Sequence, residues 1–285
     1  MKFSLVLATV GRVAEVERFL ESLVSQGYPE LELIIVDQND DERLARVVAK
    51  FRDTTRIEHT RSARGLSRAR NVGLSACTGD VVAFPDDDCV YPNGLLARVA
   101  GRLAQMPEAD GLTGQASGQR LGFSARFDTK SGWLRKYNAW SRTISFTLFL
   151  RRSLTQAVGG FDEALGVGAG TPWGAGEDLD YPLRALGLGM RIFYDPSIVV
   201  DHPGAMDGRS PSWRDLSSRS FQYGAGFGRV WRKHRYPSYL VSYYLLRPFL
   251  GSAWALVCGD RDRAAYYWNG LRGRIRGLRS KATER

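Results

Sequence analysis

Short apolar runs of strand length alternate with amphipathic helical stripes along the first half of the chain. The apolar runs are 3–7, 33–36 and 81–84, and the helical stripes are 13–24, 44–51 and 69–76. In the first stripe Val13, Val16, Leu20 and Val24 recur at helical spacing, and Gly27-Tyr28-Pro29 follow it. This strand–helix–strand order predicts parallel strands in one sheet and an α/β fold.

The loops that follow these strands are polar and cover 9–12, 37–41 and 85–89. Ligands of open parallel sheets bind outside the carboxyl ends of the strands. We therefore expect the three loops to border one binding crevice.

The second half of the chain is less regular. Residues 110–170 are rich in glycine and show weak periodicity. Two apolar runs, 192–194 and 198–200, predict strands on either side of a turn at Asp195-Pro196.

Charge divides the chain more sharply than hydropathy does. Residues 1–202 hold 24 basic and 25 acidic side chains, whereas residues 203–285 hold 16 basic and 5 acidic ones. The second segment also contains 14 of the 32 aromatic residues. A basic, aromatic segment of this kind indicates an anionic partner, either a membrane surface or a nucleic acid.

Cysteines and targeting signals bear on the compartment. Three cysteines in 285 residues fit no disulfide framework, which favours a reducing, cytoplasmic environment. The apolar N-terminal stretch is too short for a secretory signal. The segment 239–259 could be a membrane span, but Arg247-Pro248 interrupt it, and a central arginine costs about 2.5–3.5 kcal/mol on insertion scales. We expect it to lie in the membrane interface instead.

Three consecutive carboxylates, Asp86, Asp87 and Asp88, follow the apolar run 81–84. They repel one another, so a cation should offset their charge. Mg²⁺ and Mn²⁺ bind carboxylate oxygens and leave positions for substrate phosphates, which favours a metal–phosphate site. The alternative is a solvated turn that precedes the next helix.

A second acidic cluster, Glu177-Asp178 with Asp180, stands in a glycine-rich stretch. One interpretation is a helix N-terminus at which acids cap the backbone N–H groups. The other is a general base that deprotonates an acceptor hydroxyl.

His202 ends the last predicted strand, next to the change in composition. It is either a structural histidine or a metal ligand. His59 and His234 have no neighbouring motif, and the sequence assigns them no role.

Four arginines, Arg61, Arg64, Arg68 and Arg70, precede the three carboxylates. On a helix Arg64 and Arg68 share one side and suit a phosphate or an acidic partner, with a solvated face as the alternative. The sequence contains no P-loop, no dinucleotide-binding glycine motif after the first strand and no paired-cysteine zinc spacing.

Taken in order, these motifs resemble those of the family 2 glycosyltransferases of the GT-A fold. The matching segments are Ser4–Thr9 with Arg12, Ile34–Asp37, Gly65–Gly73, Gly79-Asp80, Phe84–Asp88 with Pro92, Gly159–Glu163, Gly176–Asp180 with Arg184 and Gly187, Asp195-Pro196 and His202. Each motif alone is weak, and their shared order over residues 1–203 carries the resemblance.

The resemblance implies a Rossmann-like, mostly parallel sheet flanked by helices. It divides the chain into a transferase domain at 1–203 and a largely helical, basic and aromatic extension at 204–285. Within the domain, 1–110 is expected to bind the nucleotide and 111–203 to form the acceptor side.

The implied activity is inverting transfer of one sugar from a nucleotide-diphosphate donor to a hydroxyl of a glycan or lipid-linked acceptor, in the biosynthesis of cell-surface polysaccharide or glycolipid. Asp178 matches the family's catalytic base, and Glu177 would support it. Mn²⁺ or Mg²⁺ would neutralise the donor diphosphate. The metal ligands would be Asp86, Asp88 and His202.

The donor itself would contact residues of the first half. By the same resemblance these are Thr9, Arg12, Asp37, Arg68, Arg70, Asp86 and Asp87, with Asp37 at the base or ribose.

Three features depart from the family pattern. All three positions of an acid-x-acid motif are acids here, and we favour Asp86 and Asp88 for the metal. Gln38-Asn39 replace the more usual acidic and glycine residues, so the base of the donor stays open. The Gln-x-x-Arg-Trp motif of processive members is missing, which favours single additions.

The basic, aromatic extension favours an anionic membrane surface as partner, with the protein peripheral on the cytoplasmic face. Helices packed on the body or a contact between copies in a homo-oligomer are the alternatives. Nucleic acid is disfavoured because no binding motif accompanies the aromatic residues.

Two other functions compete with sugar transfer. A nucleotidyltransferase also uses an α/β sheet and acidic metal ligands, but it needs a glycine-rich basic loop where this chain has only Gly11-Arg12. A non-catalytic, membrane-associated assembly subunit is the other possibility, and the retained acids count against it.

Overall fold

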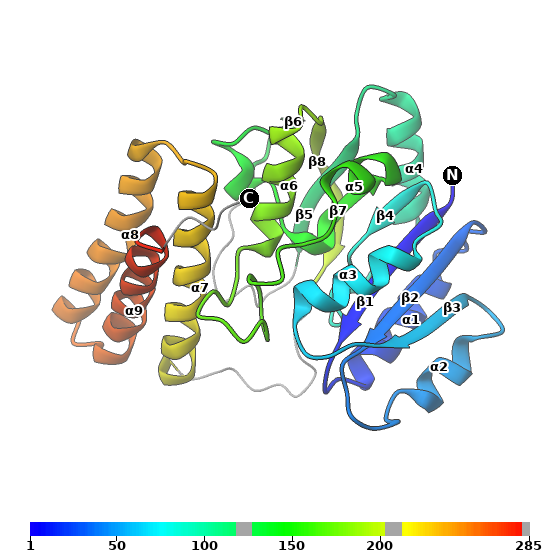
Figure 1. Cartoon of the computed structure of the whole chain (residues 1–285), viewed down its shortest axis with the longest axis horizontal. Helices are drawn as coiled ribbons and strands as arrows, with labels where there is room; N and C mark the ends of the chain where they lie inside the picture. The colour runs from blue at the N-terminus through cyan, green and yellow to red at the C-terminus, as the bar shows by residue number, and fades with distance from the viewer. Residues whose placement is uncertain (118–126, 203–212, 281–285) are drawn as a thin grey trace. The chain divides into compact units, whose positions relative to one another are not determined.

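The computed structural model describes residues 1–117, 127–202 and 213–280 (Figure 1). In these residues the strands form one sheet in the order β3-β2-β1-β4-β7-β5-β8-β6. The strands are β1 (Phe3–Thr9), β2 (Leu31–Asp37), β3 (Arg56–Arg61), β4 (Val81–Ala83), β5 (Gly111–Ser117), β6 (Gly132–Trp133), β7 (Leu148–Arg151) and β8 (Ile192–Asp201). The predicted α/β fold is confirmed.

Six helices lie between the strands, and the first three of them match the predicted stripes. They are α1 (Ala14–Val24), α2 (Ala45–Phe51), α3 (Leu66–Ala76), α4 (Leu95–Gln105), α5 (Arg152–Val158) and α6 (Glu177–Gly187), with 3₁₀ turns at Ala139–Ser141 and Ser145–Thr147. The basic C-terminal segment contains three further helices, α7 (Trp213–Lys233), α8 (Ser238–Val257) and α9 (Arg261–Leu278).

Helices bury both faces of the sheet, which explains the continuous apolar runs in β1 and β2. Phe3, Leu5 and Leu7 belong to a core shared with α1, α2 and α4. On the opposite face α3 packs so closely that a Cβ at Gly73 would lie 2.4 Å from Val6 Cγ1.

The parallel pairing of the central strands brings the three polar loops to one edge. β1 pairs with β2 in a register that places Thr9 opposite Asp37. β1 also pairs with β4, and a further bridge joins Ala8 to Asp86. The expectation that these loops lie together is confirmed.

Two strands differ from the sequence-based predictions. β8 is one strand from Ile192 to Asp201, so the predicted turn at Asp195-Pro196 is wrong. The pairing with β5 shifts register between Thr113 and Gln115, and such an irregularity lets a strand contain a proline. Strand β3 was not predicted, because its sequence RIEHTR holds only one large apolar residue.

By compactness the chain divides into two units. The first comprises Met1–Arg64, Arg68–Phe161 and Tyr181–Gly208, and the second comprises Gly65–Ser67, Asp162–Asp180 and Arg209–Arg285. The predicted boundary at 203–204 lies outside the described residues, and the halves 1–110 and 111–203 stay predictions.

Glycines set the packing inside the second unit. A Cβ at Gly228 of α7 would lie 2.1 Å from the carbonyl oxygen of Arg274, and one at Gly277 of α9 would lie 2.1 Å from that of Ala225. The two helix backbones therefore touch where larger side chains would separate them. The predicted helical extension is confirmed, and its helices are drawn from yellow to red in Figure 1.

Candidate functional site

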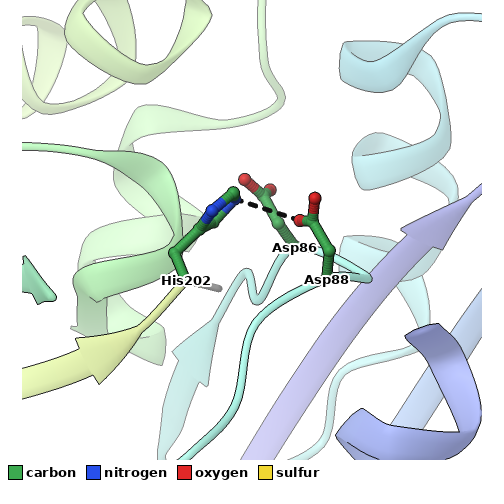
Figure 2. A group of neighbouring side chains, drawn as sticks. All are labelled: Asp86, Asp88 and His202. Carbon is green, nitrogen blue, oxygen red and sulfur yellow. Dashed lines mark ion pairs between the residues drawn. The ribbon is translucent and has the colours of Figure 1, made fainter. Parts of the chain in front are cut away.

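The first unit contains a cluster of three side chains of types that can ligate a metal, at the edge where the parallel strands end. Ligand atoms of Asp86, Asp88 and His202 all lie within 4.8 Å of one another. Figure 2 shows the two carboxylates and the imidazole turned toward one point. His202 Nε2 lies 3.0 Å from Asp88 Oδ1. The sequence predicted these three residues as ligands, and the fold brings them together.

Backbone hydrogen bonds hold the two segments that carry these side chains, the loop after β4 and the end of β8. The Val90 N–H donates to the Asp201 carbonyl at 2.8 Å, and the Asp201 N–H donates back to Val90 at 3.1 Å. The His202 N–H donates to the Ser117 carbonyl at 2.8 Å. The His202 ring packs on Phe146 with a centroid separation of 4.9 Å, so packing as well as hydrogen bonding orients the imidazole.

Arginines compensate the charge of the three carboxylates. Arg12 Nη1 lies 2.7 Å from Asp87 Oδ1 and 2.5 Å from Asp88 Oδ2. Arg70, which is 1% exposed, donates from Nη2 to Asp86 Oδ1 at 3.0 Å. The Thr9 hydroxyl donates to Asp87 Oδ2 at 2.7 Å. The repulsion inferred from the sequence is therefore offset by protein cations.

The local environment separates the pKa values of the acids. Burial acts to raise the pKa of Asp88, but the hydrogen bond from His202 and the charge of Arg12 outweigh burial and lower it to about 2. At Asp87 burial outweighs the charge of Arg12 and raises the pKa to about 6. Burial also raises the pKa of Asp86 against the charge of Arg70. Burial lowers the pKa of His202, but its hydrogen bond to Asp88 outweighs burial and raises it.

The residues present fit a divalent cation. Asp86, Asp88 and His202 offer two carboxylate oxygens and one imidazole nitrogen, a donor set that suits Mn²⁺ and, through its oxygens, Mg²⁺. Asp87 instead directs its oxygens to Thr9 and Arg12. The geometry therefore favours Asp86 and Asp88 as the metal-binding pair.

Asp37 lies in a separate hydrogen-bond network at the end of β2. Its carboxylate is buried and accepts from the Asn39 N–H at 2.8 Å and from Asn39 Nδ2 at 2.7 Å. His59 Nε2 lies 3.1 Å from its other oxygen. Asn39 Oδ1 in turn accepts from the Gly11 N–H at 2.7 Å, which ties two of the polar loops together. Asn39, one of the two residues that depart from the family pattern, thus has a structural role.

Arg68 and Arg70 do not share an environment. They stand two positions apart on α3, so they point to different sides of the helix. Arg68 is exposed, whereas Arg70 is buried against Asp86 and the Ser145 hydroxyl at 2.9 Å. A direct donor contact stays a prediction for Arg68, while Arg70 holds one of the metal-site carboxylates.

The second acidic cluster belongs to the second unit and starts α6. Gly176, at φ +99°, precedes Glu177 in a backbone conformation that suits glycine. Glu177 and Asp180 are buried, and Asp178 is half-buried. Of the three acids, Asp178 is therefore the one that solvent and a substrate can reach most easily. Acids in this first turn also match the helix dipole.

Lys233, the last residue of α7, and His234, which follows it, contact Asp180. His234 Nε2 lies 2.7 Å from Asp180 Oδ1, and Lys233 Nζ lies 2.9 Å from the same oxygen. Lys233 also pairs with Asp162 at 2.8 Å. Neither His59 nor His234 could be found from the sequence, because each meets its carboxylate only through a contact between distant segments.

Helix α7 also lies against the loop before α6. The Gly174 N–H donates to the Gln222 carbonyl at 3.2 Å. A Cβ at Gly226 would lie 2.0 Å from the Ala175 carbonyl oxygen, and the Arg229 guanidinium lies over the Trp173 ring at 5.2 Å. Packing against α7 therefore holds the loop that precedes the acidic cluster.

Comparison with known proteins decides the family. A family model described as glycosyl transferase family 2 matches residues 4–157, more than half of the chain. The chain belongs to this family. The predicted family is confirmed, and the matched range includes Thr9, Arg12, Asp37 and the three carboxylates.

Two relatives show how far this glycosyl transferase family 2 chain resembles named proteins. A pre-mycofactocin glycosyltransferase of Mycobacterium tuberculosis is 29% identical over 190 residues, which cover 62% of this chain and 37% of the relative. The glycosyltransferase AglE of Haloferax volcanii is 24% identical over 263 residues, which cover 89% of this chain and 80% of the relative. The chain thus matches little more than a third of the length of the mycobacterial relative.

A solved structure confirms the predicted GT-A fold. The mannosyltransferase PcManGT from Pyrobaculum calidifontis, in complex with GDP-Man and Mn²⁺, aligns with a TM-score of 0.67 at 18% identity. The alignment covers 98% of this chain and 87% of that one. At this identity the likeness establishes the fold.

Proposed function

We propose that this chain is a metal-dependent, inverting glycosyltransferase. It transfers one sugar from a nucleotide-diphosphate donor to a hydroxyl of a glycan or lipid-linked acceptor, in the synthesis of a cell-surface polysaccharide or glycolipid. The observation that carries the proposal is the cluster of Asp86, Asp88 and His202 at the carboxyl ends of the parallel strands in a family 2 chain.

A divalent cation bound by these residues supplies charge neutralisation for the donor diphosphate and for the leaving nucleotide diphosphate. Arginine side chains hold these carboxylates in place: Arg70 donates to Asp86, and Arg12 pairs with Asp87 and Asp88. PcManGT was solved with GDP-Man and Mn²⁺, which supports a nucleotide-sugar donor and manganese for this chain.

Asp178 is the proposed general base. It accepts the proton of the acceptor hydroxyl while the hydroxyl oxygen attacks the anomeric carbon, and the bond to the nucleotide diphosphate breaks on the opposite face. Its half-buried position supports this role, because a base must touch substrate. Glu177, the buried neighbour of Asp178 in the sequence, supports the base. Asp180 instead contacts His234 and Lys233.

Thr9, Arg12 and Asp37 form the proposed nucleotide side, with Asp37 toward the base or ribose. The close approach of loops 9–12 and 37–41 through Asn39 supports this assignment. A position on the cytoplasmic face of the membrane remains a proposal that rests on charge and apolar surface.

Two carboxylates provide the test. Thermal stabilisation by nucleoside diphosphates and nucleotide sugars, with and without Mn²⁺ or Mg²⁺, identifies the donor, since a ligand at about a hundredfold its Kd adds about 2.7 kcal/mol of stability. Asp88→Asn should abolish the metal-dependent part. Asp178→Asn should retain donor binding and lose transfer, and Glu108→Gln, an exposed acid, should change neither.

Two results would contradict the proposal. If the donor stabilises the protein equally with and without metal, and also stabilises Asp88→Asn, the proposed metal site is wrong. No response to any nucleotide in a folded sample would favour a non-catalytic assembly subunit.

A further inference from the structure

Exposed apolar side chains concentrate on α8. Among the described residues fifteen large apolar side chains are exposed, and eight of them lie on the twenty residues of this helix. They are Tyr239, Tyr243, Leu246, Phe249, Leu250, Trp254, Leu256 and Val257, each between 49% and 78% exposed. We refer to these eight as the outer face of α8.

The outer face is a continuous stripe. Positions 239, 243, 246, 250, 254 and 257 recur every three or four residues, which is the spacing of one helix side. The stripe is about 27 Å long at 1.5 Å per residue. Isolated exposed apolar residues need no explanation, but a stripe of this length indicates a binding surface.

The opposite side of α8 is occupied by α9. The Ser252 hydroxyl donates to the Ala264 carbonyl at 3.1 Å, and Arg274 Nη1 donates to the Tyr244 carbonyl at 2.7 Å. Gly251 lies against the Tyr267 ring, where a Cβ would be 3.2 Å away. Contacts with α9 therefore hold the inner side of α8, and the outer face stays exposed to solvent.

We propose that the outer face of α8 docks in the interfacial layer of an anionic lipid bilayer, with the helix parallel to the membrane plane. Leucine and phenylalanine enter the acyl boundary, and Trp254, Tyr239 and Tyr243 suit the headgroup level.

Charge favours an anionic surface over a second copy of the chain. Residues 216–280 contain twelve arginines and lysines and two acids. Two such units placed face to face would repel each other, whereas anionic headgroups attract each basic residue near the surface by about 1 kcal/mol. Arg247, exposed among the apolar residues, can reach the same headgroups by extending its side chain.

The contacts of α8 favour the interface over a membrane span. α8 alone among the described helices is long and apolar enough to cross a bilayer, with a mean hydropathy of 1.2. However, Arg247 and Pro248 stand at its centre, and α9, which packs along it, carries five arginines. A span would bring these charges into the hydrocarbon core, whereas a helix in the interface keeps them in water.

Vesicle flotation of the full chain tests the proposal without donor, acceptor or metal. We expect binding to vesicles with about 30% phosphatidylglycerol, weak binding to pure phosphatidylcholine, and loss of binding as salt rises, because surface charge is screened. The variant Leu250→Gln/Trp254→Gln should weaken binding by at least about tenfold, since it removes two large apolar anchors.

A matched control separates the outer face from general hydrophobicity. Tyr137→Gln/Leu188→Gln removes an aromatic residue and a leucine of similar exposure, 61% and 57% against 66% and 55%, and should bind as the unmodified chain does. All four positions are exposed, and unchanged thermal unfolding of both variants verifies folding.

Four outcomes would overturn the proposal. These are no binding to anionic vesicles, equal binding by both double variants, a dimer in solution that Leu250→Gln/Trp254→Gln dissociates, and resistance to extraction at alkaline pH, which marks a span. Because the assay uses no nucleotide, its failure leaves the proposed transferase activity to be judged by donor binding.

Discussion

His234 Nε2 lies 2.7 Å from Asp180 Oδ1, and this contact joins the end of α7 to the first turn of α6. Asp180 is 1% exposed and stands two residues after Asp178, the proposed base. The basic extension therefore contributes to the acidic loop as well as to the outer face of α8.

Loss of this contact should slow transfer without weakening donor binding. His234→Ala leaves a buried carboxylate with one partner fewer, at a cost of about 1–3 kcal/mol, and loosens the turn that carries Asp178. We expect kcat to fall and the donor Kd, measured by calorimetry, to stay constant. His234→Gln, which can still donate to Asp180, should recover part of the rate.

Arg232→Ala is the matched control for His234, because Arg232 is exposed in the last turn of α7, two residues before His234. It should behave as the unmodified chain does. If His234→Ala leaves kcat unchanged, or lowers kcat and donor affinity together, the contact does not position the base.

Gly226 should be intolerant of a side chain. Its Cβ would lie 2.0 Å from the Ala175 carbonyl oxygen, so Gly226→Ala must push α7 away from the acidic loop and should cost about 1–3 kcal/mol. Gly101→Ala is the control, since nothing lies within 4 Å of its Cβ in α4, and it should stabilise by about 0.5–1 kcal/mol. Chemical unfolding measures both, and equal effects would refute the close approach.

Glu32 should make stability depend on acid pH. Burial acts to raise its pKa, but hydrogen bonds from Lys2, Ser4 and Thr78 outweigh burial and lower it from 4.5 to about 2. A carboxyl with a lowered pKa stabilises the fold above its unfolded pKa, and that stabilisation is lost as pH falls from 4.5 to about 2. With allowance for solvent screening, the contribution is about 2 kcal/mol.

Unfolding by urea at pH 7 and at pH 3 measures this contribution. Glu32→Gln should destabilise the chain at pH 7 and flatten the acid limb of the pH profile, whereas Glu30→Gln, an exposed neighbour, should leave the profile as it is. An unchanged acid limb in Glu32→Gln would assign the pH dependence to other carboxyls.

Asp37→Asn separates nucleotide binding from loop structure. Both bonds from Asn39 end on Asp37 Oδ1, which an asparagine retains, and an amide nitrogen can still meet His59. The unfolding free energy should therefore change by less than about 1 kcal/mol. Loss of the charge should weaken donor binding about tenfold or more by calorimetry. Full donor affinity in the folded variant would leave Asp37 with a structural role only.

Sequence patterns were sufficient for the elements with strong periodicity. The strands at 3–9, 31–37 and 81–83 and helix α1 appear where apolar spacing predicts them, because buried parallel strands need continuous apolar residues. Arg56–Arg61 could not be recognised, since an edge strand is held by backbone pairing to β2 and needs no apolar pattern. The proposed turn at Asp195-Pro196 failed because the pairing with β5 tolerates an irregularity there.

The sequence by itself determined the α/β fold, the family, the polar loops at the strand ends and the residue types that can bind a metal. Each of these depends on local spacing or on the order of short motifs. The tertiary structure brought the predicted ligands Asp86, Asp88 and His202 together, and it alone decided two further pairs: Asp37 with His59, and Asp180 with His234. The last two pairs join segments 22 and 54 residues apart that no local pattern relates, because a contact of that kind exists only after strands have paired and helices have packed.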